Sequence, residues 1–122
     1  MKKLPLYLAR ILLSAIFIIS GIMKILDMEG TMKYMQANGM PFTMFFLICA
    51  IILELSGGIL ILTGKYEKIG ARILILFLVP TTLIFHTDFS QRMQVIQFLK
   101  NSAIIGGLFA VISKEGKIEN ND

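Results

Sequence analysis

Four long apolar stretches alternate with short polar segments along the 122-residue chain. They run from about Leu4 to Leu26, from Pro41 to Thr63, from about Ile69 to Thr87 and from about Val95 to Ser113. Each has the roughly 17 to 25 residues with which a helix crosses the hydrocarbon core of a bilayer. The pattern therefore predicts an all-α, integral membrane four-helix bundle that forms a single domain over residues 1–122.

The connection between the first and second stretches, residues 27–40, is the longest in the chain. Its methionines fall at helical spacing beside charged and amide side chains, which predicts a short amphipathic helix on the outer membrane surface. Asn38-Gly39 is a typical helix end, and Pro41 follows as a typical start of the next span.

The third stretch contains Pro80, and its uninterrupted apolar part covers only residues 73–85. Proline is tolerated in transmembrane helices when neighbouring groups satisfy the carbonyl that it leaves free. A kinked but continuous helix is therefore expected.

The composition agrees with a membrane protein, because 56% of the residues are hydrophobic and only 16% are charged. No long polar segment leaves room for a second, soluble domain. The net charge of +4 comes from Lys and Arg residues that flank the apolar stretches and do not gather on one polar face. The expected partner is therefore the lipid bilayer and not nucleic acid.

The basic residues are distributed unevenly between the two ends of the apolar stretches. The amino terminus, the second loop and the carboxyl terminus carry Lys2, Lys3, Lys65, Lys68, Lys114 and Lys117. Only Lys33 and Arg92 lie clearly within the first and third loops. The positive-inside rule therefore predicts that both termini are cytoplasmic.

Glu54 lies near the middle of the second stretch, which is otherwise uncharged. A carboxylate at that depth is costly, and such residues almost always face the interior of a bundle or a wet cavity. Gly57 and Gly58 share its face and would let another helix approach closely. Glu54 is therefore expected to contact a neighbouring helix, either in a structural ion pair or in a site that binds a ligand or relays a proton.

The depth of each ionisable group limits the pairs that it can form. At about 1.5 Å per residue, Glu54 lies about 14 Å from the cytoplasmic end of its helix and Arg10 about 9 Å from the end of its own. An extended arginine covers that difference, so an Arg10–Glu54 pair is expected. Lys24, His86 and Lys100 should form a cationic cluster in the outer third, where Lys24 or Lys100 is an alternative partner for Glu54.

The cationic groups allow a structural and a functional interpretation. Lys24 and Lys100 either extend to the outer surface or coordinate an anionic or quinone-like headgroup. Arg10 either extends to the inner surface or takes part in the site. No metal site is predicted, because His86 has no cysteine or second histidine beside it.

Polar and glycine-containing motifs follow one another in a definite order through the four stretches. They are Ala9-Arg10, Ser20-Gly21-Ile22-Met23-Lys24, Asn38-Gly39-Met40-Pro41, Glu54-Leu55-Ser56-Gly57-Gly58, His86, and Lys100-Asn101 followed by Gly106-Gly107. In this order they resemble the DoxX family of small membrane proteins, over residues 6–111.

The resemblance implies a multi-pass bundle in the bacterial or archaeal inner membrane. Some members of the family are subunits of quinone-linked oxidoreductases, and others are linked to membrane complexes that handle oxidative stress. The matching motifs carry over a polar intramembrane site consisting of Arg10, Lys24, Glu54, His86, Lys100 and Asn101. The glycines expected to mediate helix packing are Gly21, Gly57, Gly58, Gly106 and Gly107.

The first functional hypothesis is a membrane subunit that anchors a soluble or membrane redox protein and shapes a quinone or lipid site around Glu54. The sequence has no histidine pair for a haem, no cysteine pair and no glycine-rich dinucleotide motif. The subunit itself is therefore expected to be non-catalytic, with no covalently bound cofactor.

Two alternatives come from other classes of protein. Small proton-coupled multidrug transporters also combine four short helices with one membrane glutamate, although a lysine and an arginine near Glu54 would disfavour a cationic substrate. In a purely structural assembly factor, the polar groups would only specify which helices pair. Further copies of the same chain are among the candidate partners.

Overall fold

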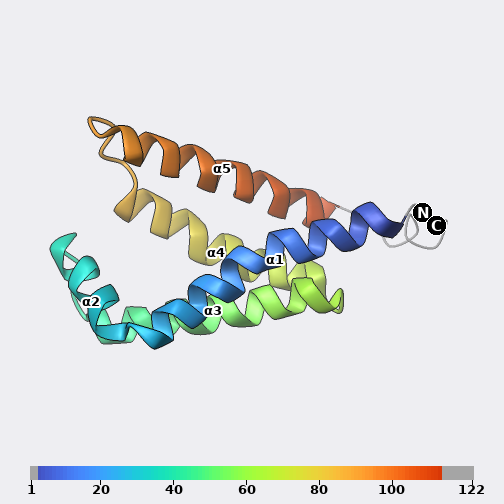
Figure 1. The fold of residues 1–122 in the computed structure, drawn as a ribbon, viewed down its shortest axis with the longest axis horizontal. Helices are drawn as coiled ribbons and strands as arrows, with labels where there is room; N and C mark the ends of the chain where they lie inside the picture. The colour runs from blue at the N-terminus through green and yellow to red at the C-terminus, as the bar shows by residue number, and fades with distance from the viewer. Residues whose placement is uncertain (1–2, 114–122) are drawn as a thin grey trace.

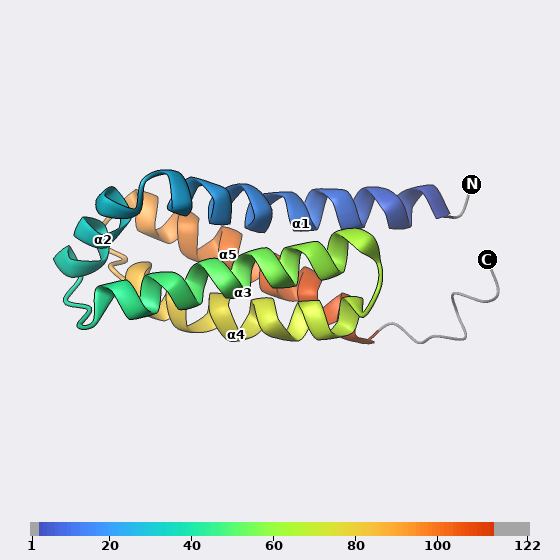
Figure 2. The ribbon, with the colours of Figure 1, turned by 90° about the horizontal axis from the view of Figure 1, so that it is seen from below.

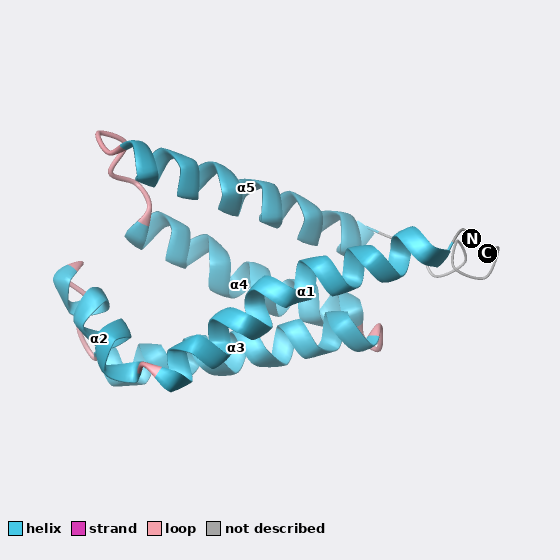
Figure 3. Cartoon of the chain, in the orientation of Figure 1, coloured by secondary structure: helices cyan, strands magenta, loops and turns pink. Residues whose placement is uncertain are grey.

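The computed structural model describes residues 3–113, which form five helices and no strand (Figure 3). The helices are α1 Lys3–Leu26, α2 Met28–Ala37, α3 Thr43–Thr63, α4 Glu67–Phe85 and α5 Arg92–Ser113. The all-α prediction is confirmed. Lys2 and the polar tail with Lys114 and Lys117, which contributed to the predicted topology, lie outside the described residues.

Four of these helices, α1, α3, α4 and α5, are long and apolar enough to cross a membrane. This confirms the predicted membrane bundle, and the bounds agree with the predicted spans within three residues. α4 and α5 begin earlier than predicted, at the charged residues Glu67 and Arg92. Polar first turns lengthen both helices beyond the apolar stretch that each contains.

The spanning helices run roughly along the long axis of the molecule, and successive ones are antiparallel (Figures 1 and 2). α1 packs on α3, α3 on α4 and α4 on α5. We call the end where α1 begins and α5 ends the inner end, and the opposite end the outer end. Figure 1 shows that α5 diverges from α1 toward the outer end.

Glycines bring α3 close to both of its neighbours. A Cβ atom on Gly21 would come within 2.7 Å of the Leu55 side chain, and one on Gly58 within 2.8 Å of the Ile18 side chain. Gly57 faces α4 instead, where a Cβ atom would come 2.5 Å from Leu74. The packing role predicted for these three glycines therefore agrees with the structure.

The two glycines of α5 behave differently from each other. A Cβ atom on Gly107 would meet only Leu13 of α1, at 3.8 Å. Gly106 is exposed, and a Cβ atom there would meet nothing within 4 Å. The packing role predicted for Gly106 is therefore wrong within the described chain, because this residue lies on the side of α5 that faces away from the other helices.

The buried hydrophobic core lies in the middle and inner part of the bundle and joins all four spanning helices. Its members are Phe17, Ile61, Ala71, Leu74, Leu78 and Leu108. α5 contributes only Leu108 and is the least buried of the four. The outer half contains a cavity instead of a continuous core.

α4 continues through Pro80 without a break, as expected. Proline removes one backbone hydrogen bond from the helix. The hydroxyl groups of Thr81 and Thr82 donate to the carbonyl oxygens of Phe77 and Leu78, both at 2.7 Å, and so add hydrogen bonds in the same turn.

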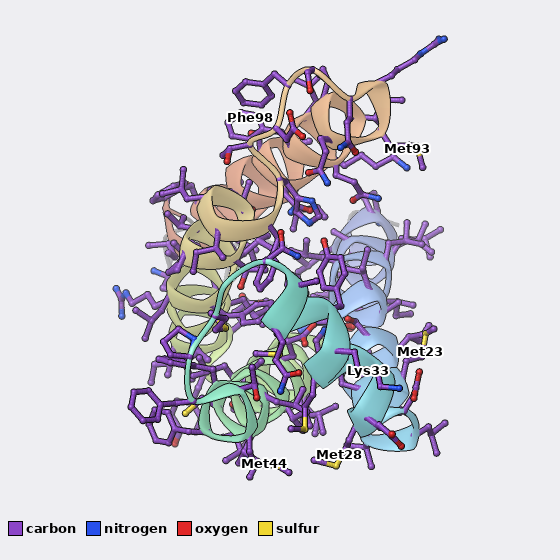
Figure 4. All side chains as sticks on the ribbon, turned by 90° about the vertical axis from the view of Figure 1, so that its left-hand side faces the viewer. Met23, Met28, Lys33, Met44, Met93 and Phe98 are labelled. Atoms are coloured by element: carbon purple, nitrogen blue, oxygen red, sulfur yellow. The ribbon has the colours of Figure 1, made fainter. Side chains whose placement is uncertain are left out.

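α2 is the predicted amphipathic helix of the first loop. The Asp27 carboxylate caps its first turn by accepting the Gly30 N–H at 3.1 Å, and Asn38 ends the helix before Gly39, whose φ is 79°. Viewed from the outer end, α2 lies across the ends of α1 and α3 (Figure 4). Met35 is its buried residue, so α2 covers part of the outer end of the bundle.

α3 is bounded by two aromatic residues in left-handed backbone conformations. Phe42 precedes the helix with a φ of 52°, and Tyr66 lies in the turn after it with a φ of 57°. Such conformations cost about 1–2 kcal/mol for a residue with a side chain. Both rings are largely exposed, at 79% and 69%.

Candidate ligand site between α1, α2, α3 and α4

Glu54 forms an ion pair with Lys24 of α1, with 2.7 Å between Glu54 Oε1 and Lys24 Nζ. Lys24 Nζ also donates to Ser20 Oγ, one turn earlier, at 2.8 Å. The Glu54 side chain is only 3% exposed and that of Lys24 is 22% exposed. A glutamate at membrane depth is thus withdrawn from lipid and held by a cation of the adjacent helix, which is the usual arrangement for such a residue.

The expected Arg10–Glu54 pair is wrong, because Arg10 lies too close to the inner end. Its guanidinium group lies against Gly64, directly after α3. Gly64 is ten residues beyond Glu54, which corresponds to about 15 Å along a helix. The alternative partner, Lys24, is the one that the structure places beside Glu54.

Lys24 reaches Glu54 because the first turns of α1 extend past the inner end of α3 (Figure 2). From Arg10, level with Gly64, the chain advances 14 residues to Lys24, or about 21 Å. Glu54 lies only about 15 Å from that level. The lysine covers the difference because helical side chains point back toward the amino terminus of their helix.

An outer cavity of about 1160 Å³ opens beside this ion pair. It lies between the outer halves of α1, α3 and α4, and α2 covers part of it. Its polar and ionisable lining residues are Ser20, Lys24, Asp27, Thr31, Tyr34, Cys49, Thr81 and His86. Its aromatic lining residues are Tyr34, Phe45, Phe46, Phe77 and Phe85.

Two ring contacts define the walls of the outer cavity. Lys24 Nζ lies 5.8 Å from the centroid of the Phe77 ring of α4, within the range of a cation–π contact. Tyr34 of α2 stacks on Phe85 of α4 with 5.3 Å between the ring centroids. The second contact fastens α2 to the end of α4 and so holds the cover in place.

The other predicted site residues are only partly brought together. His86 lines the outer cavity, and its Nδ1 lies 3.2 Å from Gln94 Oε1 of α5. Lys100 is exposed on α5 and does not line the cavity, so the predicted cluster of Lys24, His86 and Lys100 is wrong. Asn101 donates to Thr82 Oγ1 at 3.0 Å and thereby links α5 to α4 outside the cavity.

The sequence model of the DoxX family matches residues 6–87, which include most of α1, all of α2 to α4 and every residue that lines the outer cavity. The chain belongs to the DoxX family. The motifs at Lys100-Asn101 and Gly106-Gly107 lie beyond the matched residues.

Curated relatives of this DoxX protein cover nearly the whole chain. The Escherichia coli inner membrane protein YqjF is 38% identical over 110 residues, which are 88% of this chain and 83% of YqjF. The E. coli inner membrane protein YphA is 34% identical over 123 residues, covering 96% of this chain and 88% of YphA. Together with the four spans, these relatives make the DoxX protein a multi-pass protein of the cytoplasmic membrane.

A third relative has a name that describes a chemical role. CatD of Bacillus subtilis, named as a candidate oxidoreductase, is 37% identical over 62 residues, which are 51% of this chain and 45% of CatD. No solved structure matches the DoxX protein significantly.

Sequence reasoning missed several residues that line the outer cavity. Tyr34 lies among the methionines of the first loop, and Phe77 lies in a continuous apolar stretch, so neither residue stands out in the sequence pattern. Ser20 offered a usable signal, because it stands four residues before Lys24 and therefore on the same face of α1.

The site presents one fixed cation beside an aromatic, mostly apolar space. An ammonium group has three N–H donors. Lys24 Nζ donates to Ser20 and is ion-paired with Glu54, which leaves a donor for an acceptor in the outer cavity, on which Lys24 borders. This arrangement suits a flat, largely apolar molecule that carries an acceptor oxygen.

Proposed function

We propose that this DoxX protein binds a quinone in the outer cavity and acts as the membrane subunit of a quinone-linked oxidoreductase. The observation that carries the proposal is the position of Lys24, which Glu54 and Ser20 hold at the edge of an aromatic cavity within the membrane. Lys24 would donate to a quinone carbonyl oxygen, and the ring of Phe77 or Phe85 would pack on the quinone ring.

The size of the outer cavity agrees with such a ligand. Its volume of about 1160 Å³ lies slightly above the range of about 300–1,000 Å³ that is usual for small-molecule pockets. A quinone ring together with the first part of its apolar tail would use that space. The lining is rich in Ile, Leu, Met and Phe, as an isoprenoid tail requires.

The charge balance of the site favours a neutral ligand. Glu54 compensates the charge of Lys24, so the site needs no anionic ligand to satisfy the lysine. A proton-coupled transporter of cations would need Glu54 to receive its substrate. Here the substrate would have to compete with Lys24 for the carboxylate, which favours the quinone site over the transporter hypothesis.

The redox setting rests on the name of CatD, a relative over about half of this chain. In the proposed complex, a partner protein would carry the redox cofactor and deliver electrons to the quinone held beside Lys24. The residues of this chain would bind the quinone, orient its carbonyl oxygen and exclude water with α2.

The binding step is tested with the single cysteine of the chain, Cys49, which lines the outer cavity. Purified protein in lipid nanodiscs is titrated with decylubiquinone, and binding is followed by calorimetry and by the alkylation rate of Cys49. We expect the alkylation rate of Cys49 to fall as decylubiquinone is added and to reach a constant value once the site is saturated. In the Lys24→Met variant the affinity should fall about 10- to 100-fold, since a hydrogen bond from a charged donor contributes about 1.5–3 kcal/mol.

The matched control is Lys33→Met, which removes an exposed lysine of α2 whose Nζ lies 3.8 Å from Glu29. Its affinity for decylubiquinone should equal that of the wild type. Equal affinities of the wild type and Lys24→Met would contradict the proposed site.

The subunit role has a separate test in native membranes. Membranes that contain Lys24→Met or Glu54→Gln in place of the wild type should reduce added quinone more slowly per amount of the DoxX protein present. A soluble dehydrogenase should also copurify with the wild type in mild detergent. Unchanged quinone reduction with both variants would exclude the subunit role, even if the purified protein binds a quinone.

A further inference from the structure

A second cavity, of about 530 Å³, lies at the inner end of the bundle and shares no lining residue with the outer cavity. We call it the inner cavity. Its lining residues are Leu6, Ala9, Arg10, Leu12, Leu13, Ile61, Glu67, Gly107, Ala110 and Val111. They come mainly from α1 and α5, two helices that have few contacts with each other.

Small residues leave this space open. Ala9 of α1 and Gly107 and Ala110 of α5 line the inner cavity, and the nearest side chain to a Cβ atom on Gly107 would be Leu13, at 3.8 Å. The remaining wall residues are mostly Leu, Ile and Val. A slot with apolar walls between two membrane helices is suited to a lipid acyl chain.

Arg10 supplies the polar end of the inner cavity. Its guanidinium group lies against Gly64 in the turn between α3 and α4, and 4.9 Å from the ring centroid of Tyr7. Its Nε atom is buried and has no hydrogen-bond partner among residues 3–113. A buried donor without a partner is rare in native structures and points to a group that the chain itself does not supply.

The charge around the inner cavity favours an anionic partner. Glu67 also lines it, and this residue takes part in an interaction of its own. The basic residues that the structure describes at this end are Lys3, Arg10, Lys65, Lys68 and Arg72. They outnumber Glu67 there, and the positive-inside rule places them in the cytoplasmic leaflet, which contains anionic lipids.

We propose that the inner cavity is a binding site for an anionic diacyl phospholipid of the cytoplasmic leaflet. The lipid phosphate accepts hydrogen bonds from the Arg10 guanidinium group, and one acyl chain lies between α1 and α5. The guanidinium fork matches a phosphate group in geometry and charge. The lipid thereby fills the gap between two helices that otherwise have few contacts.

The test is native mass spectrometry of the detergent-purified protein titrated with phosphatidylglycerol or phosphatidylcholine of identical acyl chains. We expect one phosphatidylglycerol to bind at least about 10-fold more tightly than phosphatidylcholine, since a charge-assisted pair is lost with the zwitterionic lipid. Arg10→Gln should reduce that preference to about twofold or less. The control Arg72→Gln removes the same charge from an exposed position of α4 at the same end and should keep the preference.

A second pair of variants tests the acyl chain. Gly107→Leu places a side chain in the inner cavity and should abolish binding of the lipid, whereas Gly106→Leu, on the exposed side of α5, should not. The alkylation rate of Cys49 in the outer cavity reports whether each variant is folded. If Arg10→Gln does not fold, the comparison of lipid binding by Gly107→Leu and Gly106→Leu tests the proposal.

Three results would overturn the proposal. If Arg10→Gln and Arg72→Gln reduce the preference for phosphatidylglycerol equally, the lipid is attracted by the basic inner end in general and not by Arg10. Binding that survives Gly107→Leu would place the lipid elsewhere. Displacement of the lipid by millimolar inorganic phosphate would reveal a free-anion site without an acyl chain. Since none of these variants alters the outer cavity, failure here leaves the quinone proposal intact.

Discussion

Gly57 of α3 and Gly70 of α4 bring the backbones of the two helices into contact. A Cβ atom on Gly70 would come 2.8 Å from the Gly57 carbonyl oxygen, and one on Gly57 would come 3.1 Å from the Gly70 carbonyl oxygen. The Leu74 side chain lies even closer to a Cβ atom on Gly57, at 2.5 Å, and Leu60 Cβ lies 2.8 Å from one on Gly70. Since a carbonyl oxygen of the facing backbone stands in the way on each side, a larger residue at Gly70 would force the helices to move. This contact fixes the spacing of α3 and α4 beside the buried core.

Gly70→Ala should therefore destabilise the bundle. Overpacking costs about 1–3 kcal/mol when the surroundings cannot yield. The measurement is the free energy of unfolding in dodecylmaltoside micelles titrated with sodium dodecyl sulfate. Gly106→Ala is the control, since its Cβ atom would lie in open space. Equal stability of the two variants would contradict the backbone contact.

The Lys24–Glu54 pair should show strong coupling in a double-mutant cycle. Lys24→Met leaves the buried Glu54 carboxylate without its partner, whereas Glu54→Leu leaves the partly exposed Lys24 ammonium without one. The loss of unfolding free energy in the double variant should be smaller than the sum of the two single losses by a coupling of about 1–3 kcal/mol. The same unfolding titration measures it.

The exposed Glu29–Lys33 pair of α2 is the control for this cycle. Pairs on the surface contribute little, so its two single effects should simply add. Additive effects at Lys24 and Glu54 as well would mean that the ion pair has no energetic role in joining α1 to α3.

Tyr34→Ala should open the outer cavity. The variant removes the ring that stacks on Phe85 and with it the contact that fastens α2 over the outer cavity. We expect the alkylation rate of Cys49 to rise severalfold, while the free energy of unfolding falls by only about 1 kcal/mol. Tyr66→Ala, at the inner end, is the control and should leave the rate unchanged.

Asn101→Ala should loosen α5. It removes the hydrogen bond to Thr82, and such interhelical bonds in membranes contribute about 0.6 kcal/mol on average and at most about 1.7. In Asn101→Ala, the hydrogen exchange of the α5 amides should become faster than in the wild type, and the increase should be larger than that of the α3 amides. Ser102→Ala is the control, because the Ser102 hydroxyl donates to a carbonyl of its own helix. Unchanged exchange in Asn101→Ala would mean that packing alone holds α5.

The sequence was sufficient for the helices but not for the pairing of their charged groups. Apolar length predicts a span without any tertiary information, and α1 and α3 were found in this way. The partner of Glu54 depends on how far α1 slides along α3. The position of α1 along α3 is set by the contacts of Gly21 and Gly58, which no single-helix pattern contains.

The faces of α5 were the least predictable part. Gly106 and Gly107 are neighbours in the sequence, yet one residue step turns a helix by about 100°. Gly107 consequently lies toward α1 while Gly106 faces away, and Lys100 is likewise exposed. The polar residues of α5 do not gather on one side of the helix, so they offer no stripe from which to determine its buried side.

The two exposed rings beyond the ends of α3 match the length of this helix to one thickness of the bilayer. Its 21 residues span about 31 Å, close to the roughly 30 Å of a hydrocarbon core. Phe42 and Tyr66 stand just outside these limits, in backbone conformations that favour glycine. A thinner lipid phase would force the molecule to tilt or the surrounding lipids to stretch, so the protein should partition into membranes of matching depth.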